Sequence, residues 1–120
     1  MSATSITPLG GDPFTVSPRL RLARLARDAA LSVPGVVRMD AGPDGVFAVV
    51  SGSERVDGVL CAATAEEGFD LSLRIVCALV PLPALGARVR DGVRARAAAA
   101  GLPAVSVTVH VANVASPGEV

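Results

Sequence analysis

The sequence predicts an α+β protein: a two-layer α/β sandwich with two helices packed on one face of a mixed sheet, in the order (β)-α-β-β-β-α-β. Apolar residues recur with helical spacing over residues 18–33 and again between Pro81 and Gly101. Residues 69–80 and 104–114 instead alternate between apolar and polar side chains, as strands do. A strand, a helix and a strand in succession form a right-handed crossover, so these two strands should run parallel.

The first helix lies within "RLARLARDAALSVPGV", residues 21–36. Its predicted buried stripe comprises Leu22, Leu25, Ala26, Ala29 and Val33. Ser17-Pro18 provides the start signal, because serine accepts hydrogen bonds from free backbone amides and proline tolerates the first helical position. Pro34-Gly35 ends the helix. Arg24 and Asp28 are spaced to form an ion pair of minor worth.

Short segments surround this helix and connect it to the long strand. The segments predicted as strands are 14–16 before the helix, and 36–40, 46–50 and 59–64 after it. The remaining segments are predicted as a turn at 41–45, a polar loop at 51–58 and a hairpin turn at 65–68.

The long strand 69–80 has one apolar face, and its other face is polar only as far as Arg74. Beyond Arg74 this second face also becomes apolar, which indicates cover on both sides of the sheet. The stripe predicted for the second helix comprises Leu82, Leu85, Val89, Val93 and Ala97. The last strand is expected to point Val105, Val107, Val109 and Val111 inward, and Ser106, Thr108 and His110 outward.

The length of 120 residues indicates one domain. The formal net charge is +0, so no overall attraction to nucleic acid or anionic lipid is expected. Residues 14–114 are expected to form this domain, between a disordered segment, 1–13, and a flexible tail, 115–120. The N-terminus lacks a secretory signal, and the longest uncharged apolar run, 75–87, is too short to span a membrane. The sequence therefore predicts a cytoplasmic protein without a membrane span of its own.

No constellation of residues suggests a catalytic, cofactor or metal site. The only histidine, His110, is expected to face solvent within reach of Arg74 or Asp70. Cys61 and Cys77 lack further ligands at zinc spacing. With Cys61 paired near Ser72 on the long strand, as the hairpin turn at 65–68 implies, the two thiols would lie ~17 Å apart along it and stay free.

Two further patterns suggest binding but have simpler explanations. Glu66-Glu67 and Asp70 form an acidic group that is expected to be solvated. "GPDG" (42–45) matches the G-x-x-G loop of RNA-binding KH domains, yet it lies between strands and contains no basic residue. A KH-like nucleic-acid-binding domain remains an alternative because of the element order and the helix arginines. The balanced charge and the scarcity of aromatic residues weigh against it.

Two surfaces are candidates for protein contacts. Arginines crowd the first helix, where positive charge opposes the helix dipole at a cost of at most ~1 kcal/mol each. They are either solvated or presented to a partner, and the predicted partner-binding residues are Arg21, Arg24 and Arg27. The sheet face away from the helices is small and β-prone, and is predicted to self-associate through Ser72, Val76, Ser106 and Thr108.

The order of these patterns resembles the alkaline shock protein family of bacterial envelope stress response proteins. "RLARLARDAALSVPGVVRM" (21–39) is similar to the family's opening, "IA..AA..V.GV", and "ERVDGV" (54–59) resembles a loop of its high-GC members. Residues 70–114 are similar to its closing half: a strand, a proline-containing turn, a helix of the type "VA..VR..V", a glycine and a "V.V.V.V..V" strand. The chain departs from the family at Leu79-Val80, where members often carry Tyr-Gly.

This resemblance implies a small non-enzymatic interaction or scaffold protein of the envelope stress response, with no catalytic residues and no cofactor. It implies that a membrane-anchored protein partner holds the chain at the inner face of the cell membrane. The sheet face adds the expectation of a homo-oligomer. A small-ligand sensor domain is a third hypothesis.

Overall fold

The computed structural model describes residues 17–64, 68–102 and 104–115. Its helices are α1 (Pro18–Leu31) and α2 (Leu82–Ala99). Its strands are β1 (Val36–Met39), β2 (Ala48–Ser51), β3 (Glu54–Asp57), β4 (Val59–Ala63), β5 (Phe69–Cys77) and β6 (Ala104–Val114). The strand expected at 14–16 and the terminal segments 1–13 and 116–120 lie outside the described residues.

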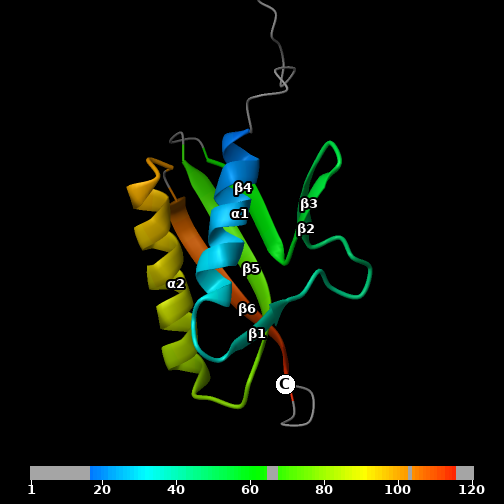
Figure 1. Ribbon diagram of the computed structural model, residues 1–120, viewed down its shortest axis with the longest axis vertical. Helices are drawn as coiled ribbons and strands as arrows, with labels where there is room; N and C mark the ends of the chain where they lie inside the picture. The colour runs from blue at the N-terminus through cyan, green and yellow to red at the C-terminus, as the bar shows by residue number, and fades with distance from the viewer. Residues whose placement is uncertain (1–16, 65–67, 103, 116–120) are drawn as a thin grey trace, which may run out of the picture.

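The predicted fold class is confirmed, because α1 and α2 lie side by side on one face of a sheet centred on β5 (Figure 1). β4 pairs antiparallel with the first half of β5, and β1 pairs antiparallel with its last residues. β6 lies on the other side of β5 and runs parallel to it, as the crossover predicts. The sheet therefore has three columns: β6, β5, and β4 followed by β1.

Five strands lie between the two helices, whereas the predicted order contains three. The segments predicted as strands between the helices are four, 36–40, 46–50, 59–64 and 69–80, and all four form strands. The fifth strand, β3, lies in the stretch 51–58, for which the prediction of a loop is wrong. β3 pairs with β2 in a hairpin of its own, outside the main sheet. Val56 is the one buried residue of β3, and Val49 of β2 lies opposite it. The other residues of β3 are polar and exposed, so the sequence shows no alternation from which this strand could be predicted.

The sequence explains where α1 begins and ends. The amide of Leu20 donates to Oγ of Ser17 over 3.1 Å, with Pro18 in the first turn, as the start signal predicts. The amide of Ser32 still donates to the carbonyl oxygen of Asp28, and the helix then gives way to Pro34. The stripe of α2 is buried at four of its five predicted positions. The exception is Leu82, which is 39% exposed because it lies in the first turn, before the helix reaches its neighbours.

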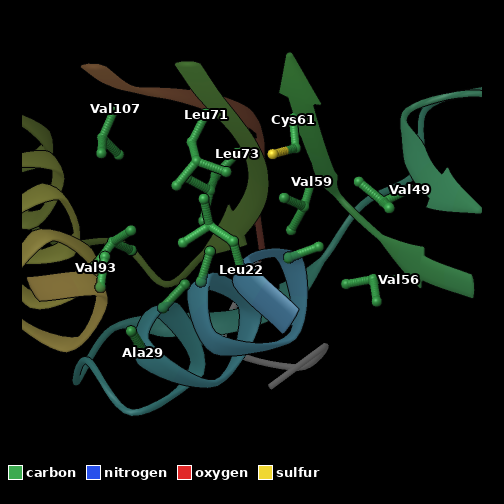
Figure 2. Packing of buried hydrophobic residues seen from close by; sticks show 14 of the residues in the cluster. Leu22, Ala29, Val49, Val56, Val59, Cys61, Leu71, Leu73, Val93 and Val107 are labelled. Carbon is green, nitrogen blue, oxygen red and sulfur yellow. The ribbon is translucent and has the colours of Figure 1, made fainter. Parts of the chain in front are cut away.

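The main core lies between the helices and the sheet (Figure 2). Leu22 of α1 points toward Leu71 and Leu73 of β5, and the hairpin adds Val49 and Val56 on one side. A smaller cluster of Ile75, Cys77 and Leu85 continues the core toward the end of β5. Within the described residues, neither helix combines the length and apolar character that crossing a membrane requires.

Candidate functional site

The arginines of α1 form the first candidate surface. Arg21 is exposed, while Arg24 and Arg27 are partly exposed. Arg24 forms an ion pair with Glu54 of β3, and Nε of Arg27 lies 3.1 Å from Oδ1 of Asp28. Such exposed pairs contribute at most about 1 kcal/mol each, so a partner with a better acceptor can displace them.

The predicted pair between Arg24 and Asp28 is therefore wrong. The carboxylate of Asp28 lies beside its neighbour Arg27, and Arg24 reaches across to Glu54, thirty residues further along the chain. The sequence does not reveal this contact, because the polar pattern of residues 51–58 predicts a loop with no fixed position against α1. A fourth arginine, Arg19, donates from Nε to the carbonyl oxygen of Cys61 over 3.1 Å and ties the start of α1 to β4.

The sheet face away from the helices is the second candidate surface. Ser72 and Thr108 are opposite each other in the β5–β6 register, and Oγ of Ser106 donates to Oδ1 of Asp70 over 2.8 Å. Ser106 and Ser72 are partly exposed, and Thr108 is exposed. These three predicted residues therefore share one accessible area.

Val76, the fourth predicted residue of this face, is only 2% exposed and does not belong to it. The β5–β6 register shifts between Ile75 and Val76, so that Val76 faces Asn113 and Ala112 is skipped. Ile75, Val76 and Cys77 are all buried, which confirms the expectation of cover on both sides beyond Arg74. A register shift of this kind leaves no mark in the alternation from which the face was predicted.

The loop between β1 and β2 covers the half of this face nearest β1. Nε of Arg74 lies 2.6 Å from Oδ2 of Asp40, and the ring of Phe47 meets the ring of His110 edge to face with centroids 6.0 Å apart. The hydrogen bond from Arg74 lowers the pKa of the Asp40 carboxyl below its ordinary value. His110 is exposed and faces Arg74 in the register, as predicted, but its ring contact is with Phe47.

The same loop contains "GPDG" (42–45), which forms a turn between two strands, as expected. A guanidinium nitrogen of Arg55 donates to the carbonyl oxygen of Gly45, so the turn is fastened to β3. Glu66-Glu67 lies outside the described residues, and Asp70 is paired with Ser106. In the described ranges no three His, Cys, Asp or Glu side chains are grouped so as to hold a metal ion.

Both cysteines are free and buried on the helix side of the sheet, and neither pairs with the other, as predicted. Cys61 faces Leu71 in the observed register, one residue from the position expected. Six residues separate Leu71 from Cys77, or roughly 20 Å along a strand. Burial raises the pKa of the Cys61 thiol to about 11 and also raises the pKa of Cys77.

A third surface was not predicted as a site. At the end of the molecule where α1 finishes and α2 begins, the amide of Ala78 donates to the carbonyl oxygen of Gly35 over 2.8 Å and joins the two loops (Figure 1). The exposed side chains there, which we term the apolar end, are Leu31, Pro34, Leu79, Pro81, Leu82 and Val114. Leu79 is 83% exposed, and neither 29–37 nor 75–87 contains a charged residue.

The sequence signal for the apolar end is the uncharged run 75–87, whose length excludes a membrane span but does not show whether it is exposed. Exposed apolar groups that adjoin one another mark places where proteins bind other molecules. The comparisons give no name to this surface: the chain matches no protein-family model, no curated protein and no solved structure.

Proposed function

We propose that the protein is a non-enzymatic interaction module that docks on another protein through the apolar end. The observation that carries this proposal is the exposure of Leu31, Leu79 and Leu82 in two segments, 29–37 and 75–87, that contain no charged residue and are joined by the hydrogen bond between Ala78 and Gly35. Burying one leucine side chain contributes roughly 1.5–3 kcal/mol, so a partner that covers these residues gains substantial affinity.

The predicted arginine surface fits this docking mode as its rim. Arg27 precedes Leu31 by four residues on α1, so the two side chains are neighbours on the helix surface. Arg24 lies one turn earlier. Protein interfaces combine an apolar centre with a polar rim and are enriched in arginine relative to the rest of the surface, and these residues supply both parts.

The resemblance to the alkaline shock protein family supports a more specific proposal. In that setting the partner is a membrane-anchored protein, and the module serves the envelope stress response from the inner face of the membrane. The apolar end then contacts the anchor protein rather than lipid, because the charge of the chain is balanced and gives no general attraction to an anionic membrane.

Affinity capture from native cells tests the proposal. The bait is the full chain, compared with Leu79→Ser and with Arg21→Glu/Arg24→Glu. Val46→Ser is the matched control, because Val46 is 76% exposed but lies in the β1–β2 loop. We expect a transmembrane protein that wild type and Val46→Ser recover equally, that Leu79→Ser loses, and that the double variant recovers less well.

Other outcomes identify the rival functions. Equal recovery by wild type and Leu79→Ser contradicts docking at the apolar end. Capture of nucleic-acid-associated proteins, with salt-dependent binding of single-stranded RNA, supports the KH-like alternative instead. One metabolite that raises the melting temperature specifically supports a ligand sensor, and a turnover abolished by His110→Ala in a folded protein contradicts a non-enzymatic role.

A further inference from the structure

The outer edge of β6, the strand on which α2 packs, is the longest strand edge in the described part of the chain that pairs with no other strand. β6 spans Ala104–Val114 and pairs only with β5 among the described residues. It contains no proline, lysine, arginine or carboxylate, the residues with which proteins usually protect an exposed strand edge. Its unpaired backbone donors and acceptors can therefore accept another strand.

At the opposite edge of the sheet, formed by β4, a backbone group that faces outward already has a hydrogen-bond partner. The amide of Arg74 donates to the carbonyl oxygen of Gly58 and that of Thr64 to Gly68, so the even-numbered residues of β4 bond to β5 and the odd-numbered ones face outward. Cys61 is one of these, and its outward carbonyl oxygen accepts from Nε of Arg19. The amide of Gly58, the residue before β4, donates to the carbonyl oxygen of Phe47.

We propose that β6 pairs antiparallel with β6 of a second copy, about a two-fold axis that passes beside Thr108. A two-fold axis perpendicular to the sheet keeps the helices of both copies on one side and places one residue opposite itself. The register of β6 against β5 is regular from Ser106 to Val111 and shifts at Ala112. Centres at Thr108 and at Val109 keep equally many pairs within this regular stretch; we take Thr108, because threonine then faces threonine and Ser106 faces His110 of the second copy.

The occupant is a second copy because β6 is complementary to itself in this register. Thr108 faces Thr108 of the second copy, which is a favourable cross-strand pair. Val107 faces Val109 on the helix side, and Ser106 faces His110 on the open side, so apolar meets apolar and polar meets polar. Because β6 contains no carboxylate, lysine or arginine, the pairing brings no two of these charges together. Thr108 and Ser106 were predicted to self-associate through the sheet face, whereas this arrangement joins the copies at the edge.

Cysteine cross-linking of the full chain tests both the pairing and its centre. Directly opposite Cβ atoms lie ~4.5–5.5 Å apart in an antiparallel pair, close to disulfide geometry. Thr108→Cys should therefore form a covalent dimer under mild oxidation at micromolar concentration. Ser106→Cys is the matched control, because its two copies would lie roughly 14 Å apart, four residues along the strand. Ala62→Cys, exposed on β4, is a second control. The buried native cysteines should not interfere.

We expect Thr108→Cys to cross-link at least tenfold faster than either control. Cross-linking of Thr108→Cys no faster than of Ser106→Cys overturns the register, and comparable rates for all three variants indicate random or face-to-face collisions instead. Light scattering gives an independent check without oxidation. Wild type should be dimeric and Thr108→Lys monomeric, with Ser51→Lys on β2 unchanged as the control. A monomeric wild type at high concentration overturns the proposal.

Discussion

Nε of Arg74 lies 2.6 Å from Oδ2 of Asp40, and this ion pair joins the centre of β5 to the loop that follows β1. The backbone of the same two residues is also linked, because the amide of Asp40 donates to the carbonyl oxygen of Arg74 over 2.9 Å. The amide of Arg74 in turn donates to Gly58 over 2.8 Å. Arg74 is thus the point of β5 at which the β4 and β1 parts of the sheet meet.

Asp40→Asn should lower the free energy of unfolding by about 1 kcal/mol at neutral pH. The gain is small because both side chains are about one third exposed and solvent screens the pair. Urea unfolding measures the difference. Asp44→Asn, an exposed carboxylate in the same loop, should leave the stability unchanged. An equal loss in both variants would mean that the Arg74 contact contributes nothing of its own.

The same pair predicts a pH dependence. The hydrogen bond from Arg74 lowers the pKa of Asp40 in the folded protein from its ordinary value of 3.8. The unfolded chain therefore binds the proton first as the pH falls. The stabilisation by Asp40 is complete above the unfolded pKa, and it is lost as the pH falls through the lower, folded pKa. Wild type and Asp40→Asn should thus differ in urea midpoint at pH 7 and converge in strong acid; a constant gap between pH 7 and pH 2 contradicts this.

Gly58→Ala should destabilise the protein far more than Gly52→Ala. Both glycines have positive φ, 80° and 61°, where a side chain costs about 1–2 kcal/mol of backbone strain. A Cβ on Gly58 would also lie 2.7 Å from Cβ of Met39 and 2.8 Å from the carbonyl oxygen of Arg74, whereas one on Gly52 meets nothing within 4 Å. We expect Gly58→Ala to lose at least ~2 kcal/mol more in thermal or urea unfolding. Similar losses in both variants would show that backbone strain alone matters.

The two thiols should resist modification while the protein is folded. The thiolate is the reactive form, and burial raises the pKa of Cys61 to about 11 and that of Cys77 above its ordinary value. At pH 8 iodoacetamide should label the folded chain at least tenfold more slowly than the chain in urea. Mass spectrometry after timed quenching measures this, and rapid labelling of the native protein at either cysteine contradicts it.

Sequence periodicity was sufficient for the elements whose burial is regular. The helices, β5 and β6 present uninterrupted apolar stripes, so their type, order and parallel pairing followed from the pattern. β3 did not, because its residues Glu54, Arg55 and Asp57 are exposed and Val56 alone is buried.

The candidate surfaces were predicted less completely, since they depend on contacts between distant segments. Arg24 meets Glu54, and Asp40 meets Arg74, only after the chain has folded. The shift in register beside Val76 is not encoded in hydrophobic alternation, whereas the burial of Val76 agrees with the apolar second face beyond Arg74. The strand predicted over 69–80 includes Leu79, but β5 ends at Cys77, which leaves Leu79 in the following loop and exposed.

The ion pair between Arg24 and Glu54 predicts how the partner affinity can be raised. Under the proposed docking mode Arg24 belongs to the rim of the interface, and Glu54 competes with the partner for its guanidinium. Glu54→Gln removes this competitor, and because an exposed pair is worth up to about 1 kcal/mol, the affinity should rise by up to about fivefold. Titration of the captured partner's soluble region measures the dissociation constant.

Asp57→Asn is the matched control for this experiment, because the carboxylate of Asp57 pairs with Arg55 on the same strand, at 2.5 Å, and not with α1. Its affinity should equal that of wild type. Arg24→Gln/Glu54→Gln should bind more weakly than Glu54→Gln, since the released guanidinium is then missing. If Glu54→Gln binds no better than wild type while Leu79→Ser still abolishes binding, the partner docks on the apolar end without using Arg24.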